Sequence, residues 1–318
     1  MKPPSPPSLI VIVGPTASGK TAVVHALAEA LPGHIINADS MQVYRYMDIG
    51  TAKPAQADRE KYPYHLIDVV VPDEAFNAAM FLEMSGAVIE REVHSDSPVY
   101  VVGGTGLYVK ILLGGLISGP GPDEQLRSKY KGLVEKYGKP WLYDLLRERD
   151  PAAAERIKSN DSVRIIRALE VLDLTGESIT RKQADHAFRG TGSYRYLKIG
   201  IKTDRDALQQ RIEKRVEQMI DLGLIGEVVN LMKMNYGADL KPMQSLGYRH
   251  MVRYIRGEWG LDEAVSSMKR DTWQYAKRQM TWFKKDGEIQ WVEMDDLAGI
   301  RNRIEAFLRK ERAKGEKP

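Results

Sequence analysis

The hydrophobic positions of the first hundred residues form short apolar runs, each followed by a polar turn and then by a segment with helical spacing. Short, fully apolar runs are typical of strands buried on both faces of a sheet. The alternation of strand and helix therefore predicts a parallel sheet flanked by helices. We expect strands at 9–13, 34–38, 65–70 and 98–102, and helices at 22–31, 78–93 and from 107 onward.

The pattern changes after a Gly-Pro-Gly-Pro segment at 119–122. From there to about 194 only helical spacing is present, at 123–137, 141–149, 152–157 and 162–174. A strand pattern returns at 196–202, helices follow at 206–222 and 262–284, and a short strand at 289–292 precedes a last helix. The sequence thus predicts an α/β fold in which an all-helical insertion, 121–195, interrupts a core formed by 1–120 and 196–318.

Composition narrows the class of protein. The 318 residues are 43% hydrophobic and 28% charged, which is ordinary for a globular chain with a full core. The absence of cysteine excludes disulfides, thiolate metal sites and cysteine nucleophiles. The N-terminal apolar run is too short for a signal peptide, and no segment has the roughly 20 apolar residues of a membrane span. We expect a cytoplasmic protein that does not bind membranes.

A glycine-rich loop follows the first predicted strand. Its sequence, GPTASGKT, matches G-x-x-x-x-G-K-[ST] at every fixed position and precedes a predicted helix. Backbone N–H groups and a helix N-terminus attract anions, a lysine adds a positive charge, and a threonine hydroxyl suits Mg²⁺. The predicted phosphate-binding residues are Gly14, Pro15, Thr16, Ala17, Ser18, Gly19, Lys20 and Thr21. The loop alone does not distinguish a nucleoside triphosphate from another diphosphate ester.

A carboxylate follows the second predicted strand. Asp39 should lie beside the phosphate loop, because the carboxyl ends of parallel strands meet at one edge of a sheet. Asp39 could help to hold Mg²⁺, could act as a general base toward an amine or hydroxyl, or could cap a turn. Its position alone leaves all three interpretations open.

Eight longer blocks carry a more specific signal. They are GPTASGKT, NADSMQVYRYMDIGTAKP, YPYHLIDVV, VVGGTGLYVKILLGGL, NDSVRIIRALEVLDLTGES, RVEQMIDLGLIGEV, QSLGYRHM and QYAKRQMTWFK. Together, and in this order, they resemble the bacterial tRNA dimethylallyltransferases, also called tRNA isopentenyltransferases or IPP transferases. The resemblance implies transfer of a dimethylallyl group from dimethylallyl diphosphate to N6 of the adenine 3′-adjacent to the anticodon in tRNA, with release of diphosphate. It also implies that the loop binds this prenyl diphosphate, with Mg²⁺ on Thr21, and that no ATP is used.

The resemblance also assigns roles to single residues. Asp39 would accept a proton from N6, Lys20 would stabilise the departing diphosphate, and Arg215 would reach the same group. Thr105, in GGTGLY, would lie near the target nucleotide, although the segment could equally be a glycine-built turn. The residues implied for tRNA binding are Asp39, Ser40, Met41, Gln42, Thr105, Arg127, Arg164, Arg167, Arg278 and Gln279.

Charge and aromatic content support an RNA partner. The segment 241–285 contains ten Lys or Arg and four Asp or Glu, interleaved with aromatic residues that could instead belong to the core. In the family the helical insertion grips the anticodon stem. Two positions depart from the family's pattern: Lys158-Ser159 stand where the family often has His-Pro, and His250 stands where an acid is common.

Three rival functions fit parts of the pattern: prenyl transfer to free adenine nucleotides, a metabolite kinase, and an RNA-binding protein with a nucleotide switch. A free nucleotide requires neither the insertion nor the basic, aromatic segment, so we favour tRNA. We expect a monomer with no obligate protein partner.

Overall fold

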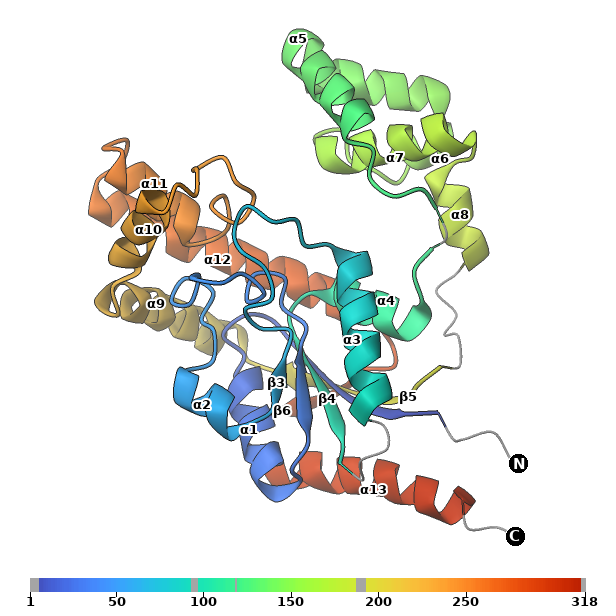
Figure 1. Cartoon of the computed structure of the whole chain (residues 1–318), viewed down its shortest axis with the longest axis vertical. Coiled ribbons are helices and arrows are strands. Elements are labelled where there is room, and N and C mark those ends of the chain that lie inside the picture. Colours follow the sequence, from blue (N-terminus) through green and yellow to red (C-terminus); the bar gives the residue numbers. More distant parts are fainter. Residues whose placement is uncertain (1–5, 93–96, 118, 187–192, 316–318) are drawn as a thin grey trace. The chain divides into compact units, whose positions relative to one another are not determined.

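The computed structural model describes residues 6–92, 97–117, 119–186 and 193–315, with side chains to residue 309. The chain divides into two compact units (Figure 1). The first comprises Met1–Leu113 and Thr191–Pro318, and the second comprises Gly114–Gly190. The second unit begins and ends a few residues before the insertion that the sequence predicts.

The first unit contains a six-stranded sheet in the order β3-β2-β4-β1-β5-β6 (Figure 1). All of these strand pairs are parallel, which confirms the predicted fold class. The strands are β1 (Ser8–Val13), β2 (His34–Asn37), β3 (Tyr64–His65), β4 (Val99–Gly103), β5 (Arg195–Lys202) and β6 (Gln290–Glu293). Residues 9–13 of the central strand β1 are at most 1% exposed, as expected for a strand covered on both faces.

Helices cover the sheet. Helices α1 (Lys20–Ala30) and α13 (Leu297–Gly315) share one hydrophobic core with the strands, in which Leu27 and Ile304 are buried. Figure 1 shows α3 (Ala78–Glu92) and α4 (Gly106–Gly114) on the other side of the strands from α13. The rings of Phe81 and Tyr108 stack at 4.3 Å and join α3 to α4. The remaining helices of this unit are α2 (Gln56–Lys61), α9 (Arg205–Asp221), α10 (Leu224–Lys233), α11 (Tyr248–Ile255) and α12 (Leu261–Phe283).

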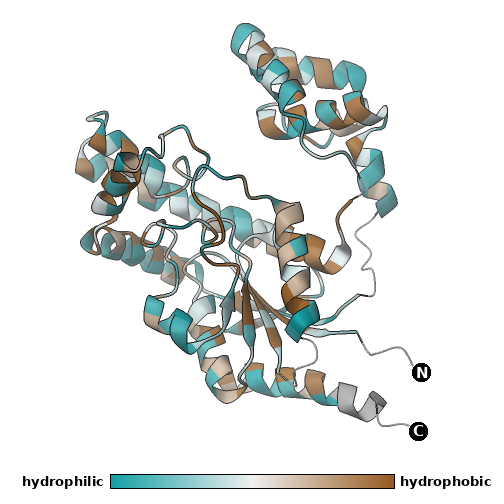
Figure 2. Ribbon diagram, in the orientation of Figure 1, coloured by the Kyte–Doolittle hydropathy of each residue, from teal (hydrophilic) through white to brown (hydrophobic). Residues whose placement is uncertain are grey.

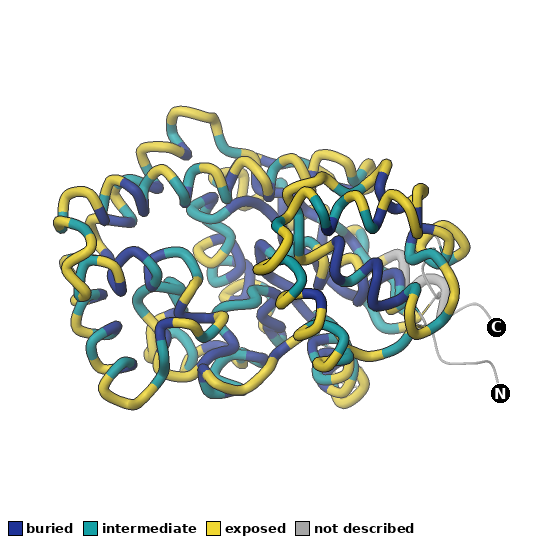
Figure 3. The backbone as a smooth tube through the Cα atoms, turned by 90° about the horizontal axis from the view of Figure 1, so that it is seen from above, coloured by how far each residue is buried: buried dark blue, intermediate teal, exposed yellow. Residues whose placement is uncertain are grey.

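The hydropathy and the burial of the chain agree with this arrangement. The central strands are largely brown in Figure 2, and the buried segments in Figure 3 are surrounded by exposed turns and helix faces. Within the described ranges, none of the helices combines the length and the apolar character that crossing a bilayer requires.

The register of the sheet brings three strand ends together. Val13 of β1 pairs with Gly103 of β4, and Asn37 of β2 pairs with Val102. The turn after β2 lies directly on β4: a Cβ on Gly103 would be 2.1 Å from the carbonyl oxygen of Ala38. Only glycine fits there, so the segments that follow these three strands start at the same edge of the sheet.

One predicted strand was too long, and one helix was not predicted. The strand predicted at 65–70 is reduced to Tyr64–His65, because Leu66 and Asp68 have positive φ angles of 62° and 56° and interrupt the extended chain. Val70 makes only an isolated bridge to Tyr44. In the helical unit, α8 (Ile179–His186) forms where no helix was predicted.

The second unit is all-helical, as expected. It contains α5 (Glu124–Arg149), α6 (Pro151–Ala154), α7 (Ser162–Thr175) and α8. Helix α5 is broken at Gly138, whose φ is 85°, so that the two helices predicted on either side of 138–140 are both present. Asp123, Asp150 and Asp161 cap helices through their carboxylates, which bind backbone N–H groups. Tyr130, Leu142, Leu146, Ile165 and Leu169 are among the residues of its core.

A buried carboxylate joins the start of α5 to α7. Glu170 is fully buried and accepts hydrogen bonds from the Asp123 N–H at 2.7 Å and the Arg127 Nε at 2.8 Å. It also accepts one from the Arg167 Nη1 at 2.6 Å. Burial alone would raise the pKa of Glu170, but the hydrogen bonds from Arg127, Arg167 and the Asp123 N–H outweigh it and lower that pKa.

Replacing Glu170 with Gln should loosen the helical unit. The amide cannot neutralise the two arginines, and we expect the free energy of local unfolding to fall by about 2 kcal/mol. Hydrogen bonds to charged groups are worth about 1.5–3 kcal/mol each, and the loss is limited because both arginines are partly solvated. Hydrogen exchange of α5 and α7 in the full-length protein measures the loss. In the wild type, the contribution of Glu170 should be present at neutral pH and should disappear as the pH falls through its lowered pKa. Glu148→Gln, at an exposed position of α5, is the control; equal exchange in both variants would contradict this account.

Candidate functional site

The phosphate loop occupies the edge of the sheet where β1 ends. Residues 14–19 join β1 to α1, and Gly19, with a φ of 94°, lies in the left-handed region as the residue before the helix. Glycine has no side chain that could cap the first turn, so the N-terminal N–H groups of α1 are not bound by the side chain of that residue. This is the arrangement of an anion-binding helix N-terminus.

Lys20 is folded back onto its own loop. Its Nζ donates to the carbonyl oxygens of Gly14 at 3.0 Å and Pro15 at 2.7 Å. Burial lowers the pKa of Lys20 to about 8; the Asp39 carboxylate opposes this shift and Arg215 adds to it. Burial likewise lowers the pKa of Arg215, which Asp39 partly offsets. Two cations and one carboxylate from distant parts of the chain thus act on one another electrostatically.

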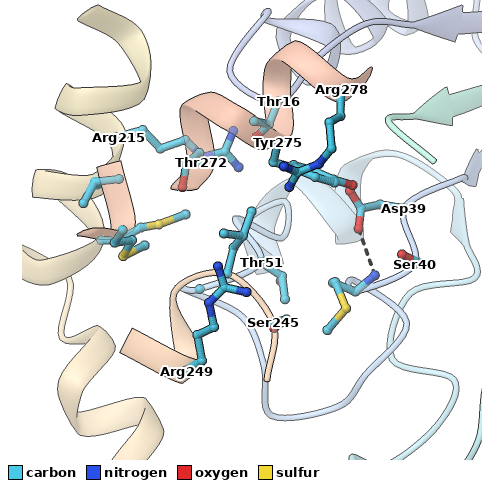
Figure 4. Close-up of a pocket in the computed structure, with 16 residues that line it drawn as sticks. Thr16, Asp39, Ser40, Thr51, Arg215, Ser245, Arg249, Thr272, Tyr275 and Arg278 are labelled. Carbon is cyan, nitrogen blue, oxygen red and sulfur yellow. Dashed lines mark hydrogen bonds between the residues drawn. The ribbon is translucent and has the colours of Figure 1, made fainter. Parts of the chain in front are cut away.

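Asp39 is fixed by the turn that follows β2. Its N–H donates to Asn37 Oδ1 at 3.1 Å, and its Oδ1 accepts from the Met41 N–H at 2.9 Å (Figure 4). The turn is bound to the segment after β4, because the Ser40 N–H donates to Thr105 Oγ1 at 3.1 Å and the Thr105 N–H donates to the Ala38 oxygen at 3.2 Å. Asp39 therefore does cap a turn, and it also lines two cavities.

Two adjoining cavities meet at Asp39. The smaller, of about 90 Å³, contains the phosphate-loop side chains Lys20 and Thr21. The larger, of about 320 Å³, is lined by polar groups and by the apolar side chains Val216, Met219, Leu246 and Met268 (Figure 4). The residues that line both cavities are Thr16, Asp39, Thr51, Arg215 and Tyr275. A group in the larger cavity would therefore face one on the phosphate loop across Asp39.

Gln279 connects the phosphate loop to the turn after β4. Its Oε1 accepts from the Thr16 N–H at 2.8 Å, and its Nε2 donates to the Gly104 oxygen at 2.9 Å. The side chain is buried, and both ends of the amide have internal partners. This geometry shows a structural link; contact of Gln279 with tRNA stays a prediction. Gln42 is also bound internally, since its Nε2 donates to the oxygens of Thr51 and Ala52, each at 3.2 Å.

The arginines expected to bind tRNA differ in their exposure and in their partners. Arg278 lines the larger cavity from α12 and its side chain is exposed. In the helical unit, Arg164 is largely exposed, whereas Arg127 and Arg167 bind Glu170 and are about one-third exposed. Recognition of RNA by these side chains stays a prediction, and Arg127 and Arg167 also have a structural role.

Sequence reasoning missed part of the cavity wall. Thr51, Ser245, Arg249, Thr272 and Tyr275 line the larger cavity (Figure 4). Four of them, Ser245, Arg249, Thr272 and Tyr275, lie in the segment 241–285, whose basic and aromatic content drew attention. No local signal separated the residues of that segment that face the cavity from those that pack elsewhere.

Among the described residues one other group could hold a metal ion: His34, His65 and Glu92. His34 begins β2, whereas Asp39 follows its end, so the two groups lie toward different ends of that strand. The His34 Nδ1 lies 3.1 Å from the His65 Nε2, and the His34 Nε2 lies 3.0 Å from the Glu92 Oε2. Mutual hydrogen bonds account for this cluster without an ion.

Comparison with known proteins supports the family resemblance that the sequence blocks indicated. The family model described as IPP transferase matches residues 42–286. A protein of Syntrophus aciditrophicus named tRNA dimethylallyltransferase 2 is 52% identical over 305 residues, 96% of this chain and 98% of that protein. A protein of the same name from Geotalea uraniireducens is 50% identical over 94% of this chain and 97% of its own length.

Solved structures agree in fold. The tRNA isopentenylpyrophosphate transferase of Bacillus halodurans has a TM-score of 0.71 at 37% identity, covering 98% of this chain and 99% of that one. A eukaryotic dimethylallyltransferase acting on tRNA has a TM-score of 0.75 at 26% identity, over 92% of this chain and 75% of that one. Given a family model that spans most of the sequence, and relatives half identical over nearly its whole length, the chain belongs to the IPP transferase family.

Proposed function

We propose that this protein transfers a dimethylallyl group from dimethylallyl diphosphate to N6 of the adenine 3′-adjacent to the anticodon in tRNA. The observation that carries the proposal is the position of Asp39 in the wall shared by the phosphate-loop cavity and the larger cavity. The larger cavity, at about 320 Å³, lies in the usual range of roughly 300–1,000 Å³ for small-molecule sites. Its relatives are named for this transfer to tRNA. A tRNA substrate would place the reaction in the cytoplasm.

The reaction replaces a carbon–oxygen bond with a carbon–nitrogen bond. The bond between the allylic carbon and the diphosphate oxygen breaks, the N6 lone pair attacks that carbon, and diphosphate leaves with the bonding electrons. Asp39 takes up one N6 proton and directs the amine, since a carboxylate within hydrogen-bond reach can serve as a general base. The adenine must leave its stack in the anticodon loop to reach this carboxylate, as in other enzymes that modify a base.

The diphosphate would bind to the loop. The N–H groups at the start of α1, together with Lys20 and Arg215, offset the charge that develops on the leaving group. Oriented donors of this kind are commonly worth about 3–4 kcal/mol each in the transition state. Two of the three N–H donors of Lys20 bind the carbonyl oxygens of Gly14 and Pro15, which leaves the third for the diphosphate.

The donor set of the smaller cavity fits Mg²⁺. This ion prefers oxygen ligands, retains several waters and usually binds through one or two protein oxygens together with substrate phosphates. The exposed Thr21 hydroxyl and the Asp39 carboxylate line the same cavity and supply such oxygens. Bound there with the diphosphate, Mg²⁺ would neutralise part of its charge.

The remaining contacts with tRNA belong to the proposal. Ser40, Met41 and Arg278 line the larger cavity beside Asp39 and are available to the flipped base or its neighbours. Thr105 would act through the turn that it fixes. In the helical unit, Arg164, with Arg127 and Arg167, would bind the backbone of the anticodon stem.

Asp39→Asn tests the role of the carboxylate. The amide oxygen can still accept the Met41 N–H, so the turn should be preserved while the base is lost. We expect kcat to fall by about 10²–10⁴-fold, because the general base is lost. The Kd for an anticodon stem-loop should change by less than about threefold, since the fold and the phosphate contacts are kept. Labelled dimethylallyl transfer and direct binding measure the two quantities, and the exposed Asp73→Asn is the control. Unreduced transfer would refute the assignment; transfer to AMP but not to the stem-loop, or ATP turnover without prenyl donor, would refute the function.

Diphosphate binding should weaken as the pH rises. Protonated Lys20 attracts the anion, and its pKa of about 8 means that this charge is lost through the mildly alkaline range. Between pH 7 and 9 we expect the Kd for inorganic diphosphate to rise by about tenfold relative to a Lys20→Met variant, which corrects for ionisation of the ligand. Calorimetric titration at constant ionic strength measures this ratio, and a ratio that does not change with pH would show that Lys20 does not bind the anion through its charge.

A further inference from the structure

One carboxylate behind the larger cavity accepts four hydrogen bonds. Glu227 lies on α10, and its Oε2 accepts from the backbone N–H groups of Asp48 at 2.9 Å and Ile49 at 2.8 Å. Its Oε1 accepts from the Gly50 N–H at 3.1 Å and from the Tyr248 hydroxyl at 2.6 Å. Three consecutive backbone donors that converge on one carboxylate form a small anion-binding concavity, which this side chain fills.

The groups bound by Glu227 belong to two separate segments of the cavity wall. Gly50 and Thr51 line the larger cavity from the loop 48–52. Ser245 and Arg249 line it from the segment that contains Tyr248 (Figure 4). These segments are nearly two hundred residues apart in the sequence, and Glu227 binds both. Its carboxylate therefore sets the position of one relative to the other.

The contact between these segments is close. Tyr248 is fully buried, and a Cβ on Gly50 would lie 2.4 Å from its ring. Burial raises the pKa of Tyr248, and the neighbouring Glu227 carboxylate adds to the rise, so its hydroxyl remains a donor. Without an acceptor at this place, the buried Tyr248 hydroxyl and the partly buried N–H groups of Ile49 and Gly50 would lose their partner, which is costly for donors shielded from water.

The inner side of the same loop is bound to the turn that carries Asp39. Gln42, three residues after Asp39, donates to the oxygens of Thr51 and Ala52. The loop 48–52 is thus held between Gln42 on the catalytic side and Glu227 on the outer side. A displacement of the loop would change the space in front of Asp39.

We propose that Glu227 is a positioning residue, which holds the loop 48–52 against α11 so that the larger cavity is formed before tRNA binds. The proposal rests on the proposed function, because a tRNA adenine is taken as the occupant of that cavity. Glu227 acts through the loop and through Tyr248. The phosphate loop is held separately by Gln279, so binding of the prenyl donor should not depend on Glu227.

Steady-state kinetics of Glu227→Gln test this role. The amide has a similar size but only one accepting oxygen, and it directs an NH₂ group toward backbone donors. We expect the KM for an anticodon stem-loop to rise by about tenfold, because the variant alters formation of the base-binding wall. The chemical step is unaffected, so kcat should change by less than about threefold. The KM for dimethylallyl diphosphate should change by less than about twofold. Hydrogen exchange of residues 48–52 should become faster in the same variant.

Two further variants keep the test decisive. Tyr248→Phe removes one of the four hydrogen bonds, so it should raise the same KM by a smaller factor even if Glu227→Gln folds poorly. Glu217→Gln, which removes a carboxylate of α9 paired with Lys269 at the surface, should leave KM and loop exchange unchanged. A purely structural role would lower the melting temperature of Glu227→Gln and leave its loop exchange and both KM values as in the wild type. That result, or a fall in kcat at constant KM, would overturn the proposal.

The two proposals fail in different measurements. If the wild-type protein transfers no prenyl group to the stem-loop, the proposed function is wrong. Loop exchange and direct binding of the stem-loop still test the positioning role in that case. If the wild type is active and the Glu227 and Tyr248 variants behave as it does, only the positioning role is wrong.

Discussion

The site depends on the close approach of two backbones at the edge of the sheet. The carbonyl oxygen of Ala38 lies so near Gly103 that no side chain fits between them. This contact places Asp39 next to the segment that follows β4, and the pairing of β4 with β1 places both beside the phosphate loop. A carboxylate and an anion-binding loop can share a cavity because three parallel strands end in register. Two long-range side chains then fix this arrangement, Gln279 on the phosphate loop and Glu227 on the loop 48–52.

Much of the core could be predicted because its signals are local. The apolar runs of β1, β4 and β5 identify buried strands, and the fixed positions of the loop at 14–21 predict an anion site. The prediction of a strand at 65–70 was wrong for a local reason as well. Leu66 and Asp68 adopt left-handed backbone angles, which their residue types did not indicate. The kink of α5, in contrast, could be read from Gly138 and Pro140.

The partners of long side chains could not be predicted in the same way. Gln279 and Thr16 are 263 residues apart, and no feature near either residue indicates that an amide will bind a loop N–H. The family resemblance implied tRNA contacts for Arg127 and Arg167, and nothing in the sequence indicated that they bind the buried Glu170. Glu227 lies in a block that resembles the family, although nothing in that block marks it as the acceptor for three N–H groups of another segment. Such contacts depend on tertiary packing, which periodicity does not encode.

The two hydrogen bonds from Lys20 to its own loop have a consequence for selectivity. Before any ligand arrives, the ammonium group already has two neutral acceptors, the oxygens of Gly14 and Pro15. An incoming anion can accept the third N–H directly, and it gains the other two only in competition with these internal acceptors. A hydrogen bond to a charged oxygen is roughly twice as strong as one to a neutral oxygen. On the proposed function, a densely charged diphosphate would gain more from this exchange than a singly charged anion. We therefore expect the loop's self-bound state to disfavour weakly charged competitors such as chloride, without any additional residue devoted to excluding them.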